Sequence, residues 1–297
     1  MKIQYSDNYY ADIGMHIFPM HKYALVKNMI ENSDLPIKIT ESKPIDDIDI
    51  LRVHEKKYLE AMQTGVPESL AQSNEIKWSL DFLKSCLFQT GGTYESAKLA
   101  LNERVSGNIG GGFHHAKKEN GSCYCTFNDL AIAIKKLQSE NMIKKALVLD
   151  CDLHYGDGTA KIFKNDDSVF TFSLYGKETW AVPFKSTSSK AIKLKEGTRV
   201  QEYIEILSNE FNKIIEQFQP NLILYNAGAD VHNEDPMSNL DMSTSDLAKK
   251  DELVLQTAKQ NSVPITITLG GGYNRDISKV VEIHFNTFKK ACEVFSN

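Results

Sequence analysis

Residues 146–158 read ALVLDCDLHYGDG, a short apolar run that is followed at once by three aspartates and a histidine. The apolar run, residues 146–150, has the length of a buried strand and is a predicted strand. In open parallel α/β sheets, the residues that follow a strand lie at the edge where ligands bind. Three further apolar runs are predicted strands, at residues 169–174, 221–226 and 264–269. The stretch therefore predicts an α/β fold with functional residues at the carboxyl edge of its sheet.

Longer amphipathic segments alternate with these runs from residue 90 onward. Apolar residues recur in them at three- and four-residue spacing, which is typical of helices with one buried face, at residues 128–140, 200–218, 246–259 and 276–295. This alternation predicts β-α-β units and a parallel sheet. The first 90 residues are less regular, and we predict helices there near residues 20–31, 55–62 and 76–87. Because no repeat or linker interrupts the chain, we expect residues 1–297 to form a single domain.

The composition excludes several classes of protein. Lys plus Arg total 34 against 39 Asp plus Glu, so the net charge of −5 gives no attraction to nucleic acid or to an anionic membrane. No apolar run approaches the length of a membrane helix, and residues 1–14 lack a secretory signal. The five cysteines are odd in number and scattered, so we expect reduced thiols and a cytoplasmic location. Cys123 and Cys125 could form a redox or metal element, but loop cysteines are the favoured interpretation.

A metal site is the first feature predicted at the sheet edge. Asp152 and His154 are two residues apart, so at the end of a strand their side chains point the same way. Asp230, which follows the strand at 221–226, could supply a third ligand. Two carboxylates and one imidazole suit Zn²⁺, and also Fe²⁺ or Co²⁺, and three ligands leave one position open for chemistry. Taken singly, each motif could equally be a turn cap or an Asx turn.

A base and an oxyanion donor are predicted beside this metal. His114 and His115 follow three glycines, and a histidine next to a metal-bound water can take its proton. Asp150 and Asp157 could each hold one of these rings, although Asp157 alone would read as an ordinary turn residue. Tyr273 follows a second glycine triplet and could donate to a developing oxyanion or simply pack. Together these groups indicate metal-assisted hydrolysis of a carbonyl compound.

Six motifs then point to one family. GGGFHHA, FND, DCDLHYGDG, NAGAD, DPM and LGGGY occur in the order found in the zinc-dependent histone deacetylases, over roughly residues 90–295. The chain resembles that family, and its last third and the HIFPM sequence at residues 16–20 resemble the class IV branch and its bacterial relatives. The resemblance implies an arginase-like fold, with a mostly parallel eight-stranded sheet and helices on both faces.

The resemblance also implies a role for each site residue. Zinc would be held by Asp152, His154 and Asp230. His115 would be the main general base and acid with Asp157 behind it, His114 would be an electrostatic partner with Asp150 behind it, and Tyr273 would polarise the amide carbonyl. Members of the family also bind potassium near the zinc, and the matching positions here are Asp150, Asp152, His154, Ser173 and Leu174.

The substrate channel departs from the family pattern. Tyr155 stands where a second histidine is usual, and Cys123 and Tyr124 replace a glycine and a phenylalanine of the channel wall. The other channel positions implied are those of Phe113, Met237 and Gly271. The opposite wall, near residues 180–184, has no clear match. These departures bear on the choice of acyl chain more than on the chemistry.

The leading hypothesis is therefore a hydrolase that removes acetyl groups, and long fatty acyl groups as well, from lysine ε-amides of a peptide or protein. An alternative is an amidohydrolase of acetylated polyamines or other small amines. Met237 stands where an acidic gatekeeper would be needed, although Glu234 or Asp235 could substitute. A two-manganese ureohydrolase is disfavoured because position 156 is glycine. A non-catalytic reader of acyl-lysine is disfavoured because binding needs neither the base nor the tyrosine.

Overall fold

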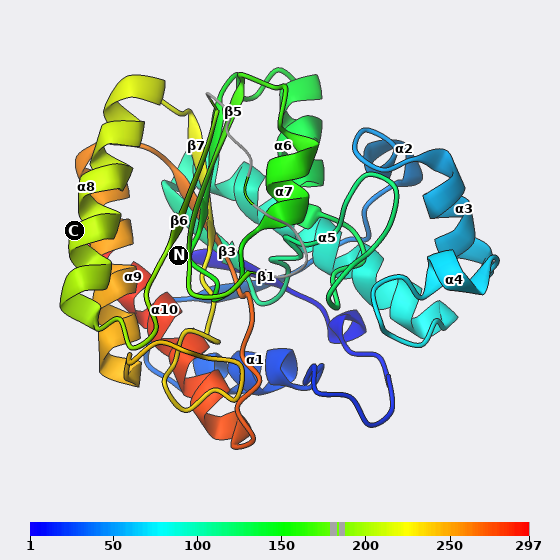
Figure 1. Ribbon diagram of the computed structural model, residues 1–297, viewed down its shortest axis with the longest axis horizontal. Helices are drawn as coiled ribbons and strands as arrows, with labels where there is room; N and C mark the ends of the chain where they lie inside the picture. The colour runs from blue at the N-terminus through cyan, green and yellow to red at the C-terminus, as the bar shows by residue number, and fades with distance from the viewer. Residues whose placement is uncertain (179–182, 184–187, 297) are drawn as a thin grey trace.

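An eight-stranded sheet lies at the centre of the computed structural model, which describes residues 1–178, 183 and 188–296 (Figure 1). The strand order is β2-β1-β3-β8-β7-β4-β5-β6, and every neighbouring pair is parallel. The strands are β1 Lys2–Tyr5, β2 Lys38–Glu41, β3 Val105–Asn108, β4 Ala146–Asp150, β5 Val169–Tyr175, β6 Ser189–Lys193, β7 Leu222–Asn226 and β8 Ile265–Thr268. The predicted α/β fold is confirmed, and the described sheet is parallel throughout.

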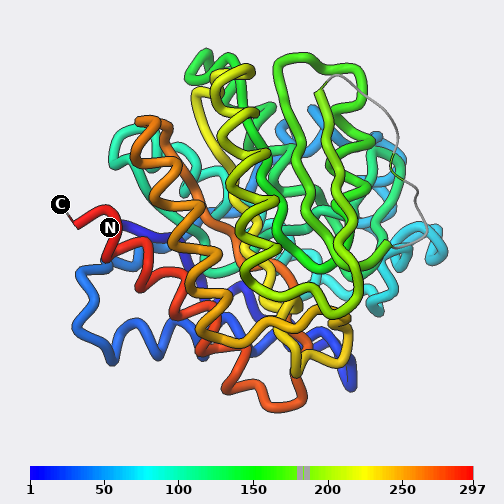
Figure 2. Tube along the Cα trace, turned by 60° about the vertical axis from the view of Figure 1, so that its left-hand side comes forward, coloured from blue at the N-terminus to red at the C-terminus, as the bar shows by residue number. Residues whose placement is uncertain are grey.

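Two layers of helices cover the sheet (Figure 1). One layer holds α1, α8, α9 and α10, which lie side by side in Figure 2, and the other holds α5, α6 and α7. Outside this layer, the short helix α2 packs against α6, α3 packs against α5, and α4 packs against α3. The helices are α1 Lys22–Glu31, α2 Asp47–Ile50, α3 Lys56–Thr64, α4 Glu68–Ala71, α5 Leu80–Glu103, α6 Asp129–Ser139, α7 Asp157–Ile162, α8 Val200–Phe218, α9 Thr244–Gln260 and α10 Ile277–Phe295, with a 3₁₀ turn at Asp7–Tyr9.

The central strands and the C-terminal helices follow the predicted pattern closely. Strand β4 and helix α8 begin and end at the predicted residues, and β5, β7 and β8 differ from prediction by one or two. Strands β4, β7 and β8 are buried on both faces, which accounts for the continuous apolar runs of β4 and β7, whereas β8 alternates isoleucine with buried threonine. Helix α8 buries one stripe of apolar residues against the sheet. Among the described residues, no helix is both long and apolar enough to cross a membrane.

The prediction for the first third was wrong in one helix and incomplete in the strands. Helix α5 continues to Glu103, whereas the sequence interpretation ended it at residue 87. Gly91 and Gly92 lie inside this helix. These positions need glycine, because a Cβ at Gly91 would meet the Lys43 carbonyl oxygen at 1.8 Å and a Cβ at Gly92 would meet the Tyr9 hydroxyl at 1.9 Å. The glycines allow close packing and do not end the helix. Strands β1 and β2, and β6 farther along the chain, were not predicted, because they are short and β2 and β6 lie at partly exposed edges. Strand β3 was indicated only weakly, at residues 107–109.

Candidate active site

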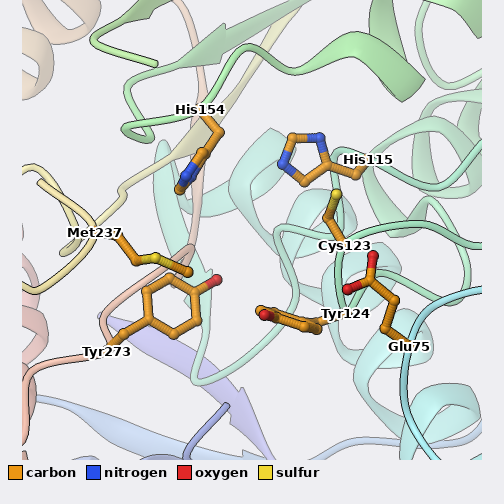
Figure 3. A pocket seen from close by; sticks show the side chains of 7 residues that line it. All are labelled: Glu75, His115, Cys123, Tyr124, His154, Met237 and Tyr273. Carbon is orange, nitrogen blue, oxygen red and sulfur yellow. The ribbon is translucent and has the colours of Figure 1, made fainter. Parts of the chain in front are cut away.

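The polar segments of the sequence meet at the carboxyl edge of the sheet. Strands β3, β8, β7 and β4 are consecutive neighbours, and the loops at residues 109–116, 269–273, 227–235 and 151–156 follow them. Because parallel strands end at the same edge, these four loops converge there. Figure 3 shows His115, His154 and Tyr273, which come from three of these loops, around one pocket.

Three of the predicted ligands form a cluster suited to a metal ion. The ligand atoms of Asp152, His154 and Asp230 all lie within 4.8 Å of one another. One oxygen of Asp230, Oδ1, accepts the Leu153 N–H at 3.0 Å, whereas the buried Oδ2 accepts no hydrogen bond of good geometry and has the His154 ring nitrogen 3.2 Å away. An unsatisfied carboxylate oxygen is costly to bury unless a cation binds it. A Cβ on Gly271, whose φ is +52°, would lie 2.4 Å from the Asp230 carboxyl carbon, so this position needs glycine. The residues present therefore fit a divalent metal.

The His154 ring faces both carboxylates of the cluster. Nδ1 of His154 lies 3.3 Å from Asp152 Oδ1 and 3.2 Å from Asp230 Oδ2. Although burial opposes it, these two carboxylates raise the pKa of His154 to about 10. An imidazole must be neutral to bind a metal, so metal binding at this cluster displaces a proton.

Each histidine of the adjacent pair contacts its own buried aspartate. Nδ1 of His114 lies 2.6 Å from Asp150 Oδ2, and Nδ1 of His115 lies 2.6 Å from Asp157 Oδ1. The two rings are 4.0 Å apart between centroids. The second oxygen of Asp157 lies 3.2 Å from the Lys117 ammonium nitrogen. Asp157 is the first residue of α7, so it stands at the start of a short helix as well as in the predicted turn.

The two histidines differ in proton affinity. For His114, burial lowers the pKa, but Asp150 and Asp152 outweigh burial and raise it to about 9. For His115, burial and then the positive charge on His114 lower the pKa to about 4, in spite of Asp157. His115 is therefore neutral near pH 7 and able to accept a proton.

Asp129 anchors the glycine loop that carries both histidines, and the sequence analysis assigned it no role. Its Oδ2 accepts the Gly112 N–H at 2.9 Å and its Oδ1 accepts the Phe113 N–H at 2.7 Å. The Thr93 hydroxyl donates to the same carboxylate at 2.6 Å. Gly111 and Gly112 have φ values of +75° and +82°, a conformation that favours glycine. The FND motif contained this residue, but nothing in the motif indicated its partners.

Tyr273 lies opposite the histidines on the loop after β8. Burial, and then the nearby Asp230 and Asp152 carboxylates, raise the pKa of Tyr273 well above its usual value, so its hydroxyl keeps its proton and can donate it in a hydrogen bond. Its backbone N–H donates to Asp235 Oδ2 at 2.6 Å. From below, the fully buried Lys22 ammonium donates to the Gly271 carbonyl.

A pocket with about 470 Å³ of empty space adjoins the histidines and Tyr273 (Figure 3). Its lining comprises Glu75, His115, Cys123, Tyr124, His154, Met237 and Tyr273. The predicted channel residues Cys123, Tyr124 and Met237 are thus brought together, and Glu75 is an addition that no motif indicated. Phe113 and Gly271 line a second, deeper hollow of about 320 Å³ instead. Residues 180–182 and 184, where the opposite wall was sought, lie outside the described residues.

Three of the five positions implied for potassium lie on the neighbouring strands β4 and β5, and the other two, Asp152 and His154, follow β4. Asp150 on β4 is paired in register with Ser173 on β5, and Leu174 follows it. The Gly156 N–H donates to the Ser173 hydroxyl at 3.4 Å.

All five cysteines have free thiols, as expected.

The pattern of the histone deacetylase domain matches residues 16–288. The chain belongs to the histone deacetylase family. It is 33% identical over 94% of its length to an uncharacterised protein of Picosynechococcus, of which it covers 94%. It is also 28% identical to Histone deacetylase 2 of Arabidopsis thaliana, over 90% of this chain and 72% of that one. Identity to the acetoin utilization protein AcuC of Staphylococcus aureus is 25%, over 91% and 76% of the two chains. Like other histone deacetylase family members, the chain is a deacetylase or related amide hydrolase.

Proposed function

We propose that this protein is a zinc-dependent hydrolase that removes acyl groups, both acetyl and long-chain fatty acyl, from the ε-amide of lysine. The observation that carries the proposal is the convergence of a neutral histidine, a protonated tyrosine and a three-ligand cluster around one pocket. Acceptance of long acyl groups rests on the class IV resemblance. The whole chain would act as one catalytic domain.

Asp152, His154 and Asp230 are the residues that would hold the zinc, or Fe²⁺ in its place. A divalent metal bound there would polarise the amide carbonyl and acidify a water molecule. The potassium positions, Asp150, Asp152, His154, Ser173 and Leu174, would place a second positive charge near the His114 pair.

His115 and Tyr273 would carry the proton steps. Because Nδ1 of His115 is held by Asp157, Nε2 is the nitrogen left to accept a proton from the attacking water. The Tyr273 hydroxyl would donate a hydrogen bond to the carbonyl oxygen as negative charge develops on it. His115 would then return the proton to the amine nitrogen as the carbon–nitrogen bond breaks, which leaves a carboxylate and a free lysine.

The pocket lining supports an acyl-lysine substrate over a polyamine. Met237 offers no charge to a distal ammonium group, and the two nearby carboxylates have other partners. Glu234 pairs with Lys279, and both oxygens of Asp235 accept backbone N–H groups. The alternative substrate, a small acylated amine, is favoured by one observation, the Glu75 carboxylate in the pocket lining.

Mass-spectrometric turnover of a substrate panel tests the proposal. The panel contains lysine peptides with acetyl to myristoyl groups and N-acetylated diamines, incubated with zinc-loaded protein. We expect the peptides to be hydrolysed, and the Tyr273→Phe variant to lose ~10²- to 10³-fold in kcat, the cost of one oxyanion donor. Tyr203→Phe is the matched control, because it removes a buried phenol oxygen on α8 that does not line the pocket and whose polar neighbour is the Cys151 thiol. Turnover of diamines alone would establish the alternative, and no turnover of any substrate would refute both.

A further inference from the structure

Asp235 is a buried carboxylate at the site that belongs neither to the metal cluster nor to the histidine pairs. Its side chain is 4% exposed. Oδ2 accepts the backbone N–H of Tyr273 at 2.6 Å, and Oδ1 accepts the backbone N–H of Met237 at 2.9 Å. One side chain therefore connects the loop after β8 with the loop after β7, and both of the residues it holds line the pocket.

We propose that Asp235 is a positioning residue that sets where the Tyr273 hydroxyl lies relative to the pocket wall at Met237. The proposal rests on the proposed function, in which Tyr273 donates to the carbonyl oxygen. Asp235 does not touch the reacting atoms and acts only through the backbone of the tyrosine.

The loop at residues 270–273 depends on such external contacts. Gly271 and Gly272 have φ values of +52° and +91°, and glycines supply no side chains that could pack and fix the loop. Gly270 accepts the Ala229 N–H at 3.1 Å, and the Asn274 side chain donates to the Glu234 carbonyl at 3.0 Å. Segment 229–235 thus supports the loop, in addition to Lys22, and Asp235 is its contact with the backbone of Tyr273.

The chemistry of the Asp235 contact makes it a strong support. A hydrogen bond from a backbone N–H to a carboxylate is shorter and about twice as strong as one between neutral groups. Burial, and then the negative charge on Asp230, raise the pKa of Asp235 to about 6, so near pH 7 the group is still ionised and both oxygens accept. Because both oxygens are engaged inside the protein, Asp235 is not free to bind a cationic group of a substrate.

A double-mutant cycle separates positioning from general structural support. In Asp235→Asn, the amide nitrogen faces one of the two N–H donors, so one hydrogen bond is lost. We expect kcat on an acyl-lysine peptide to fall about tenfold or more while KM changes by less than about threefold, because misplacement of a catalytic group by 1 Å costs up to about a hundredfold. In the Tyr273→Phe background the same substitution should change kcat by less than about threefold, since there is no phenol left to misplace. An equal loss in both backgrounds would overturn the proposal.

Hydrogen exchange of the Tyr273 amide gives a second readout that needs neither metal nor substrate. We expect this amide to exchange at least about tenfold faster in Asp235→Ala than in the parent protein, because alanine leaves neither acceptor oxygen for it. The matched control is Asp241→Ala, which removes an exposed carboxylate paired with Arg199. Unchanged exchange at Tyr273 in Asp235→Ala overturns the proposal.

The two measurements also distinguish this proposal from the proposed function. If the parent protein hydrolyses no acyl amide, the proposed function fails, and with it the positioning role, whereas the exchange result still reports whether the Asp235 contact protects the loop. If Asp235→Asn does not fold, Asp235→Ser retains one acceptor in a smaller side chain and enters the same cycle. Loss of kcat that depends on the Tyr273 hydroxyl supports the proposal in either variant.

Discussion

The His114–Asp150 and His115–Asp157 pairs share one geometry, with a distance of 2.6 Å between Nδ1 and the carboxylate oxygen in each. Their pKa values nevertheless move in opposite directions, to about 9 for His114 and about 4 for His115. The neighbours of each pair account for the difference. Nε2 of His114 lies 3.6 Å from a second carboxylate, that of Asp152, whereas His115 has the charged His114 ring beside it.

The comparison shows that the aspartate on Nδ1 orients each histidine ring, whereas the charged groups around the pair determine the pKa of the ring. One ring holds a proton and supplies positive charge to the site. The other is neutral and can act as a base. Changes to each pair should therefore have different consequences, and four such changes test the comparison.

The largest difference is expected between alanine variants of the two histidines. His115→Ala should lower kcat by ~10²- to 10⁴-fold, the usual contribution of a general base. His114→Ala should cost at least about tenfold less, because it removes a charge and leaves the base. Steady-state kinetics on an acyl-lysine peptide, with the metal content of each variant matched, measures both. Equal losses would mean that the two rings share the proton transfer.

The next test compares the two aspartates. Asp157→Asn should lower kcat by about tenfold or more with little loss of stability, because an amide holds the ring less firmly in the required tautomer. Asp150 also accepts from the Asn226 side chain at 3.0 Å and from the Asp152 N–H at 3.2 Å. Asp150→Asn should therefore reduce the free energy of unfolding by about 1 to 3 kcal/mol, the cost of leaving buried groups unsatisfied. Denaturant unfolding and steady-state kinetics of both variants test this contrast. An equal loss in the free energy of unfolding of the two variants would contradict it.

A smaller effect is expected in the pH profile. The positive charge on His114 lowers the pKa of His115, after burial, so its removal in His114→Asn should raise that pKa. His115 works as a base only when neutral, and activity is lost as the pH falls through its pKa. The acid limb of kcat/KM should therefore move to higher pH in the variant. A limb that stays in place would show that His114 carries no charge in the working enzyme.

The smallest effect is expected at Lys117. Although burial opposes them, the His115 ring and the Lys117 ammonium lower the pKa of Asp157. The Lys117 side chain is 21% exposed, so solvent weakens its share. Lys117→Met should cost less than about 1 kcal/mol, or up to about fivefold in kcat. Lys117→Arg, which keeps the charge, serves as the control and should restore most of the activity.

The sequence predicted those parts of the site whose residues lie close together in the chain. Strand β4 could be predicted from its apolar run. The residues at its end, Asp150, Asp152 and His154, are of types that indicate metal binding and acid–base chemistry. The FND and DPM motifs contain Asp129 and Asp235, but the roles of these two residues could not be predicted, because each binds a backbone N–H group that is 16 or 38 residues away. Glu75 likewise reaches the pocket only through the fold.

The fold of the first third was harder to predict because its signals come from packing. In the sequence, Gly91 and Gly92 suggest that a helix is interrupted, yet in the structure they allow α5 to approach the Lys43 carbonyl and the Tyr9 hydroxyl. Strand β2 shows no apolar alternation, since it is an edge strand with a single neighbour. The periodicity of apolar residues indicates which faces of an element are buried. It does not indicate where two backbones are in contact, or where an edge strand buries few side chains.

The position of β8 has a consequence for how the protein is made. This strand pairs with β3 on one side and with β7 on the other, although about 160 residues separate it from β3. A growing chain therefore cannot complete the centre of the sheet until residues 265–268 have left the ribosome. Contacts over such separations form slowly, and partly made sheets expose strand edges that pair with other chains. A chain halted before residue 265 would hold all three proposed zinc ligands and still present two open edges to its neighbours.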